Sequence, residues 1–384
     1  MKYPLRSGNR IDLLDSGAQF FPALIAALEA AQHEIFFETY IYAEDDTAQK
    51  VTDALAAAAR RGVTVRVIVD GFGSRDMAQA YRASLTAAGV ELLAYRPPLW
   101  WQPVRGLRRM HRKLAVADQS LALVGGINIV DDWNAPDEVP PRYDYAVRIA
   151  GPLAGDVAEA AWHLWVIVSY TAFRRRAARA TRLPQLPAVA GPMPARFLVR
   201  DNLAHRQDIE EAYLDAINGA RASIMLAIAY FLPSGRVFDA LASAARRGVA
   251  VRILLQGPSD QPLLMLASQF LYRRLQAAGI TVIEYRKSFL HTKVAVIDDL
   301  WATVGSSNLD PFSLLLSREA NVEIFDPEFA RSLRTSLESA IAGGGEVVTR
   351  STLARYGWAT RLAQWASYRF SRALIDWLNL AKKN

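Results

Sequence analysis

The sequence predicts an α/β fold made of two similar halves, because two patterns occur twice along the chain. The pattern His-x-Lys-x4-Asp begins at His111 and again at His291, and each copy is followed by a Gly-rich turn that ends in Asn. The second copy lies 180 residues after the first (291 − 111). The segments 59–68 and 245–254 also share Ala-Arg-Arg-Gly-Val followed by an apolar run. We expect two α/β sandwich halves, with mixed central sheets flanked by helices, related by pseudo-twofold symmetry around a single site at their interface.

Each half is expected to begin with an Ala-rich helix and an apolar strand, followed by a second helix and a Val/Ile strand. In the first half these are a helix at 21–32, a strand at 35–42, a helix at 49–61 and a strand after Gly62. In the second half they are a helix at 208–220, a strand at 223–231, a helix at 237–247 and a strand after Gly248. Each Gly follows two arginines, which is typical of a helix C-terminus.

The repeated motifs are expected to lie on strand hairpins. Strands are predicted at 114–117 and 294–297, followed by tight turns and by returning strands at 121–124 and 301–304. A His and a Lys two positions apart on a strand point to the same face. Asp118 and Asp298 complete the motifs and are included among the catalytic candidates, although their spacing puts them on the opposite strand face, at a turn.

Composition limits the classes of function. The chain has 384 residues, of which 52% are hydrophobic and 22% charged, as in a globular protein, and it has no cysteine for disulfides or thiolate metal sites. The N-terminus lacks the apolar core of a signal peptide, and no segment approaches the ~20 apolar residues that span a bilayer. The net charge of +7 favours an anionic partner, either nucleic acid or acidic lipid.

The residues of the motifs indicate phosphodiester chemistry. Catalysis at an anionic phosphodiester requires cations and hydrogen-bond donors where charge develops. Lys113 and Lys293 are the expected cations, and the expected donors to phosphate are Asn128, Asn308 and Ser306. With these cations present no metal or cofactor is expected. One histidine can attack phosphorus while the other acts as general acid and base. We assign His111 as the nucleophile and His291 as the acid/base, in a pattern that is nearly symmetric.

A carboxylate is expected to orient each imidazole. The candidates are Asp144 and Glu319, which follow the two Gly-rich turns. The alternative for each is an ion pair with the neighbouring Arg142 or Arg318. Glu38 lies in an otherwise apolar strand, and we expect it to form a buried pair with an arginine rather than to face the site.

These residues resemble the signature of the phospholipase D superfamily, a doubled HxKx4D followed by a GSxN-like turn. Segments 37–46, 110–113, 144–148 and 302–311 are most similar to bacterial cardiolipin synthases, and the lack of N-terminal spans is similar to their B-type. The resemblance implies a phosphohistidine intermediate and transfer of a phosphatidyl group to a glycerol-type hydroxyl, as in cardiolipin formation from two phosphatidylglycerols. Gly126 departs from the signature, which has Ser at this position.

We divide the chain into a first half (1–170), a linker rich in Arg and Pro (171–195), a second half (196–345) and a C-terminal tail (346–384). The tail predicts an amphipathic helix with an apolar face, a basic stripe and tryptophans near the border. It is interpreted as an in-plane membrane anchor, or alternatively as a helix packed on its own domain or on a partner subunit.

Three regions favour lipid over nucleic acid as the partner. They are the Trp pair above an Arg cluster, the apolar segment 261–275, which could line an acyl-chain groove or form a core helix, and the tail. The candidates for lipid contact are Trp100, Trp101, Leu264, Phe270, Trp358, Trp365 and Trp377. We expect anionic phospholipids and the membrane surface as partners, without nucleic acid, and a peripheral location on the cytoplasmic face of the bacterial inner membrane. The alternatives are a phospholipase D-type hydrolase, a nuclease of the same superfamily and a catalytically dead lipid-binding scaffold.

Overall fold

The structure is a computed structural model that describes residues 3–96, 108–135, 139–171, 187–201, 204–257, 259–310, 313 and 316–380. The elements of the first half are β1 (Arg6–Asp15), α1 (Ser16–Ala30), β2 (Glu34–Thr39), α2 (Asp46–Arg60), β3 (Thr64–Asp70), α3 (Gln79–Ala87), β4 (Glu91–Tyr95), β5 (Leu114–Ala117), β6 (Leu121–Gly125), β7 (Arg142–Tyr143), β8 (Tyr145–Ala150) and α4 (Pro152–Thr171). Those of the second half are β9 (Met193–Arg200), α5 (Asp208–Gly219), β10 (Ser223–Ile228), α6 (Gly235–Arg246), β11 (Ala250–Gln256), α7 (Pro262–Ala277), β12 (Thr281–Tyr285), β13 (Phe289–Leu290), β14 (Lys293–Ile297), β15 (Trp301–Gly305), β16 (Glu319–Ile324), α9 (Pro327–Gly344) and β17 (Gly345–Val347). Two further helices follow, α10 (Arg350–Ala354) and α11 (Trp358–Leu380).

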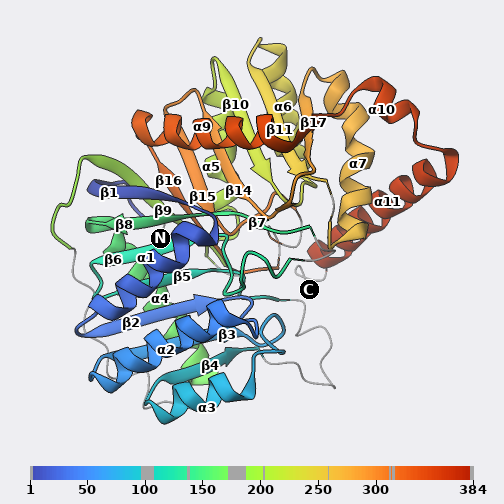
Figure 1. The fold of residues 1–384 in the computed structure, drawn as a ribbon. Coiled ribbons are helices and arrows are strands. Elements are labelled where there is room, and N and C mark those ends of the chain that lie inside the picture. Colours follow the sequence, from blue (N-terminus) through green and yellow to red (C-terminus); the bar gives the residue numbers. More distant parts are fainter. Residues whose placement is uncertain are drawn as a thin grey trace.

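One mixed sheet of 15 described strands runs through both halves (Figure 1). Its order is β4-β3-β2-β5-β6-β8-β1 in the first half and β12-β11-β10-β14-β15-β16-β9 in the second, with β17 at the outer edge. The halves join where β1 and β9 pair in antiparallel fashion. The repeated strand order confirms the predicted pair of α/β sandwich halves.

Helices cover both faces of this sheet. Helices α4 and α9 pack on one face, and the apolar cluster beneath them is continuous across the two halves. Helices α1, α2 and α3 cover the other face in the first half, and α5, α6 and α7 cover it in the second. Helix α4 of the first half contacts β9 of the second, and α9 of the second half contacts β1 of the first. Each half therefore places a helix over the junction strand of the other half.

The predicted hairpin turns and helix ends are confirmed. Asp118 and Gln119 have φ of 50° and 57°, and Asp298 and Asp299 both have 54°. Two successive positive φ values are the signature of a type I′ turn, whose twist matches that of the paired strands. Gly62 has φ of 93° and lies just after α2, as expected for a helix that ends on a left-handed residue.

The expected boundaries need two changes. Strand β9 begins at Met193, inside the segment assigned to the linker. Strand β17 pairs with β12, and Leu353 of α10 is buried in the second-half core, so the separate tail begins later than residue 346. Most of the linker, including its run of arginines from Arg174 to Arg182, lies outside the described residues.

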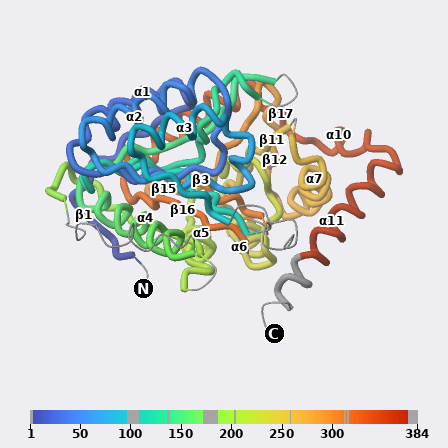
Figure 2. Tube along the Cα trace, turned by 90° about the horizontal axis from the view of Figure 1, so that it is seen from below, coloured from blue at the N-terminus to red at the C-terminus, as the bar shows by residue number. Residues whose placement is uncertain are grey.

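Helix α11 extends beside α7 at one side of the molecule (Figure 2). It packs with a polar face, since Gln364, Ser367 and Ser371 are buried. Phe270 of α7 stacks on Tyr368 with ring centroids 4.7 Å apart, so it packs between the two helices. Among the side chains of α11 described up to residue 374, the large apolar ones that stay exposed are Trp358 (80%), Leu362 (55%), Trp365 (50%) and Phe370 (58%). No helix in the described ranges has the length and apolar character needed to cross a membrane.

Candidate active site

The backbone places each motif histidine beside the opposite half. The N–H of His111 donates to the carbonyl of Arg318 at 2.9 Å, next to a bridge between Met110 and Arg318. In the reciprocal arrangement β13 pairs in parallel with β7, and the N–H of His291 donates to the carbonyl of Tyr143 at 2.8 Å. Each histidine is therefore bonded to the residue that directly precedes the candidate carboxylate of the other half.

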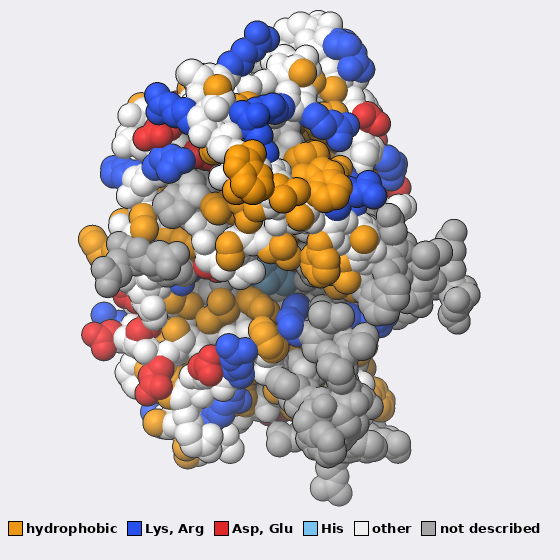
Figure 3. Space-filling model, turned by 90° about the vertical axis from the view of Figure 1, so that its right-hand side faces the viewer, with side chains coloured by type: hydrophobic (Ala, Val, Ile, Leu, Met, Phe, Trp, Pro, Cys, Tyr) orange, Lys and Arg blue, Asp and Glu red, His pale blue; other side chains and the backbone are white. Residues whose placement is uncertain are grey.

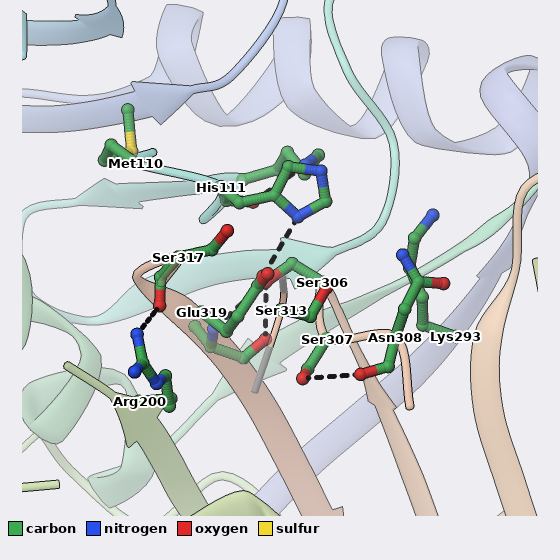
Figure 4. A network of polar contacts seen from close by, with 12 residues as sticks. Met110, His111, Arg200, Lys293, Ser306, Ser307, Asn308, Ser313, Ser317 and Glu319 are labelled. Atoms are coloured by element: carbon green, nitrogen blue, oxygen red, sulfur yellow. Dashed lines mark hydrogen bonds and ion pairs between the residues drawn. The ribbon is translucent and has the colours of Figure 1, made fainter. Parts of the chain in front are cut away.

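The imidazole–carboxylate pairs are formed between the halves. Nδ1 of His111 lies 3.0 Å from Oε2 of Glu319 (Figure 4). Nδ1 of His291 lies 2.8 Å from Oδ2 of Asp144. When Nδ1 carries the proton and donates it to the carboxylate, Nε2 of each ring has a lone pair for attack or proton transfer. Besides burial, Lys293 lowers the pKa of His111 and Lys113 lowers that of His291, so the two pairs share one electrostatic environment.

The arginines that the sequence offers as alternative partners are engaged elsewhere. Arg318 donates through Nε to the hydroxyl of Tyr95 at 3.3 Å, and Arg142 donates through Nε to the carbonyl of Asn134 at 2.8 Å. Arg142 also lies over the ring of Phe289, 5.1 Å from its centroid. The geometry thus supports imidazole orientation as the role of Asp144 and Glu319.

Both motif lysines are buried at the site. Nζ of Lys293 donates to Oδ2 of Asp144 at 3.0 Å, and Nζ of Lys113 donates to the carbonyl of His111 at 2.7 Å. Burial lowers the pKa of Lys113 to about 7, and it also lowers the pKa of Lys293. An anionic phosphate beside these groups would raise both pKa values again, because a nearby negative charge favours the ammonium form.

The same environment acts on the other titratable groups. Burial, followed by the nearby Lys293 ammonium, lowers the pKa of His291 to about 3. Burial also lowers the pKa of His111, although Glu319 opposes this shift. Burial alone would raise the pKa of Asp144, but Lys293 and His291 together outweigh it through charge and hydrogen bonds, and the pKa falls. Both imidazoles are therefore neutral before an anion binds.

The two motif asparagines have equivalent anchors. Oδ1 of Asn128 accepts from the N–H of Ile41 at 3.0 Å, and Oδ1 of Asn308 accepts from the N–H of Tyr230 at 3.3 Å. Ile41 and Tyr230 follow β2 and β10, which are equivalent strands. Because each carbonyl is bonded to the backbone, the amide N–H₂ group is the end of each side chain that can donate to phosphate.

Ser306 differs from its expected role. Its hydroxyl donates to Oε2 of Glu319 at 2.6 Å, the same oxygen that contacts His111. The hydroxyl proton that we expected to bind phosphate is donated to this carboxylate, so Ser306 helps to hold Glu319 in place instead. At Gly126 a Cβ atom would lie 2.4 Å from both oxygens of Asp144. The position of Asp144 therefore explains why the first half has Gly where the signature has Ser.

The motif aspartates lie at the far ends of the motif strands. The carboxylate of Asp118 accepts from the backbone N–H groups of Gln32, His33 and Glu34. That of Asp298 accepts in the same way from residues 221–223. These contacts correct their inclusion among the catalytic candidates, because each carboxylate is bound to backbone amides and faces away from the histidines.

Glu38 is confirmed as a buried ion pair. Its carboxylate accepts from Nε and Nη2 of Arg112 at 2.7 and 2.5 Å. Arg112 lies between His111 and Lys113 and points to the other face of the chain, as strand alternation requires. The pair anchors the motif segment without entering the site.

Sequence reasoning missed the aromatic side chains around the imidazoles. Tyr40 contacts His111 edge-on, with ring centroids 4.8 Å apart, and Phe289 stacks on His291 with centroids 6.1 Å apart. Tyr40 directly follows β2, and Phe289 lies two residues before its histidine. These aromatic residues could have been found from the sequence by their positions, one at the end of a strand and one next to a motif histidine.

The remaining candidates concern lipid contact. Leu264 lines a small cavity together with Tyr230, whose ring lies 6.4 Å from that of His291. Trp100 and Trp101 lie outside the described residues, as does the side chain of Trp377. Within the described ranges no group of three or more His, Cys, Asp or Glu side chains is arranged to hold a metal ion.

Comparison with known proteins identifies the family. The family described as cardiolipin synthase, PLD-like domain, matches residues 24–139 and 213–341. Cardiolipin synthase B of Escherichia coli (strain K12) is 40% identical over 388 residues, covering 98% of this chain and 92% of that protein. Cardiolipin synthase of Geobacillus thermodenitrificans (strain NG80-2) is 31% identical over 328 residues, covering 84% of this chain and 64% of that protein.

A solved structure shares the fold. The crystal structure of phosphatidylserine synthase from Haemophilus influenzae Rd KW20 matches with a TM-score of 0.72 and 16% identity, covering 97% of this chain and 96% of that one. At this identity the match concerns the fold alone. Because the family model matches most of the chain and a cardiolipin synthase B is 40% identical over 98% of it, the chain belongs to the cardiolipin synthase family with PLD-like domains.

Proposed function

We propose that this protein transfers a phosphatidyl group from one phospholipid to a glycerol-type hydroxyl, as in the synthesis of cardiolipin from two phosphatidylglycerols. The observation that carries the proposal is the pair of imidazoles, each oriented by a carboxylate from the opposite half and each accompanied by a buried lysine. The printed names of the relatives, cardiolipin synthase B and cardiolipin synthase, support the same reaction.

The first step forms a phosphohistidine. Nε2 of His111 attacks phosphorus of the donor lipid, and the bond between phosphorus and the headgroup oxygen breaks. His291 gives its Nε2 proton to the departing alkoxide, which leaves as the free alcohol. The substrate's negative charge raises the pKa of His291 from about 3 and so favours the protonated imidazole that this step requires.

The second step reverses the first with a new alcohol. The acceptor hydroxyl gives its proton to Nε2 of His291, its oxygen attacks phosphorus, and the bond from phosphorus to His111 breaks. Lys113, Lys293 and the amide groups of Asn128 and Asn308 stabilise the charge on the non-bridging oxygens in both steps. These groups are fixed before the substrate binds, so they need not reorganise during the reaction.

We further propose that the protein binds the membrane surface through α11 and acts as a peripheral enzyme on the cytoplasmic face of the bacterial inner membrane. Figure 3 shows a large hydrophobic patch bordered by Lys and Arg, close to a hollow in which a histidine side chain is visible. The exposed Trp358 and Trp365 suit the membrane interface, where amphipathic rings gather. Because α11 packs on α7 with its polar side, its apolar side remains available to lipid.

Transfer is tested with vesicles of labelled phosphatidylglycerol, with and without free glycerol. The expected products are cardiolipin and glycerol, and added glycerol should reverse the reaction. Phosphatidic acid as the sole product would establish the hydrolase, and DNA cleavage without lipid turnover would establish the nuclease.

His111→Ala and His291→Ala should each lower turnover at least ~10³-fold. The control is His163→Ala, which should leave turnover unchanged because the side chain of His163 is 53% exposed on α4. Biological activity that survives without turnover in a variant carrying both His111→Ala and His291→Ala would favour the catalytically dead scaffold.

Membrane binding is tested by co-sedimentation with phosphatidylglycerol vesicles. Trp358→Ala with Trp365→Ala should weaken binding by about tenfold or more, because each large side chain contributes about 1.5–3 kcal/mol when fully buried in apolar surroundings. Leu300→Ala is the matched control, since Leu300 is 59% exposed at the turn between β14 and β15. Equal binding of all variants would disprove the role of α11.

A further inference from the structure

A surface groove follows α1 in the first half. One face of α1 forms one wall, and the start of α2 together with residues 131–133 forms the other. The groove encloses about 540 Å³, a volume typical of small-molecule sites, which span ~300–1,000 Å³. Its apolar lining consists of Ala18, Phe21, Pro22, Ile25, Ala26 and Trp133.

One end of the groove lies beside the active site. Gly17 and Asp132 line both the groove and a smaller cavity that is also lined by Asn128, Asp144 and His291. A Cβ atom on Gly17 would lie 2.6 Å from both Asp132 and Phe21, so a larger residue would obstruct this junction. The groove therefore ends next to the cavity of the imidazole that handles the leaving and entering alcohols.

The start of α1 is bonded to the active site. Ser16 has φ of 62°, and its N–H donates to the carbonyl of Asp144 at 2.9 Å. Residues held in this region of φ are strained, and such strain is often found at functional sites. The bond fixes the first turn of α1, and with it the groove wall, relative to the carboxylate that orients His291.

Two of the three acidic residues that line the groove, Asp131 and Asp132, accept hydrogen bonds from the chain. Asp131 accepts from the hydroxyl of Thr47 at 2.5 Å and from the N–H of Trp133 at 2.9 Å. Asp132 accepts from the first N–H groups of α1, and burial raises its pKa to about 6. Lys50 adds a cation to the lining. The groove thus combines an apolar floor with two carboxylates that are already bound by the protein, and Glu29 lines it farther along α1.

We propose that this groove binds one acyl chain of the phospholipid whose headgroup is held at His291, an inference that rests on the proposed phosphatidyl transfer. Gly17 and Glu29 are 12 residues apart (29 − 17), which corresponds to about 18 Å along the helix at ~1.5 Å per residue. The hydrocarbon layer of one leaflet is about 15 Å deep, half of ~30 Å. The groove therefore has the length of one acyl chain and would keep that chain out of water while its headgroup reacts.

Ala26→Trp tests the proposal by filling the groove. Ala26 is exposed on the outer face of α1, so the added ring enters the groove and not the core. Ala30→Trp is the matched control, because Ala30 is exposed at the end of the same helix and does not line the groove. We expect Ala26→Trp to raise KM for long-chain phosphatidylglycerol at least tenfold and to leave KM for the dihexanoyl lipid unchanged. An equal effect on both lipids, or no effect, would overturn the proposal.

Photocrosslinking gives a second readout that does not depend on turnover. Phosphatidylglycerol with a diazirine in one acyl chain is irradiated with the unaltered protein, and the labelled peptide is identified by mass spectrometry. Label on 17–29 or on Trp133 is expected. Label found only on other peptides would overturn the groove assignment. A change of oligomeric mass in Ala26→Trp would also overturn it, because the groove would then be a contact between protein molecules. An unaltered protein that takes up label there without transfer would instead contradict the proposed reaction.

Discussion

His111 and Glu319 are 208 positions apart in the chain, yet Nδ1 of the imidazole lies 3.0 Å from Oε2 of the carboxylate. His291 and Asp144 repeat this relationship in the opposite direction, at 2.8 Å. Each half supplies the histidine of one pair and the carboxylate of the other. Neither half can therefore form a complete imidazole–carboxylate pair by itself, and the orientation of both rings depends on the contact between the halves.

Glu319→Gln and Asp144→Asn should each lower kcat by ~10²–10⁴-fold, because a neutral amide neither fixes the Nδ1–H tautomer nor stabilises an imidazolium. Steady-state kinetics on folded protein is the measurement. Glu338→Gln serves as the control, since Glu338 pairs with Arg252 and its side chain is 40% exposed. An increase in KM with unchanged kcat would contradict an orienting role and favour one in substrate binding.

The value of kcat/KM should fall as the pH rises through about 7. A lysine is charged below its pKa, and burial lowers the pKa of Lys113 to about 7, so the ammonium is lost above that pH in the free enzyme. The profile of kcat/KM reports the free enzyme and should show this limb, while kcat should hold to higher pH because bound phosphate favours the ammonium. Lys113→Met should be less active and lack the limb. A profile that stays flat to pH 9 would contradict this assignment.

Asp118→Asn and Asp298→Asn should lower stability and spare catalysis. Each carboxylate accepts three backbone N–H groups, and charged hydrogen bonds of this kind contribute ~1.5–3 kcal/mol. We expect each variant to lose ~1–3 kcal/mol in urea unfolding, with kcat per folded molecule unchanged. A hundredfold loss of kcat in well-folded protein would return these residues to the catalytic set.

Gly126→Ala should harm turnover more than Ser306→Ala. The added Cβ would lie 2.4 Å from the carboxylate of Asp144, which must move and take His291 with it. Ser306→Ala removes one hydrogen bond to Glu319, which costs ~1–3 kcal/mol for a bond to a charged group. Comparing kcat of both variants checks the order. The reverse order would mean that Ser306 contacts the substrate directly.

Arg112→Met should destabilise the protein by ~3–5 kcal/mol, because it leaves the buried Glu38 carboxylate without its cation. The double variant Glu38→Leu with Arg112→Met should recover most of this loss, since well-packed apolar residues can replace a buried ion pair. Urea unfolding of both variants gives the comparison. No recovery in the double variant would mean that the pair itself stabilises the motif segment.

Local chemistry made much of the protein predictable. The positive-φ turns at Asp118 and Asp298, the glycine after α2 and the arginine partner of Glu38 all follow from preferences that operate within a few residues or from the cost of a buried charge. The repeat predicted two equivalent halves because similar sequences fold alike. The polar packing of α11 was not predictable, because its amphipathic pattern does not say which face meets α7.

The sequence by itself determined the chemical groups of the site: two histidines, two lysines and two asparagines at one offset of 180 residues, and two candidate carboxylates that are 175 residues apart (319 − 144). Only the tertiary structure decided which carboxylate meets which imidazole, that Ser306 bonds to Glu319, and that a groove along α1 ends beside the cavity that Asp144 lines. Spacing along a chain reports neighbours on the same strand or helix. Contacts between side chains 147 or 208 positions apart exist only after the two halves have packed together.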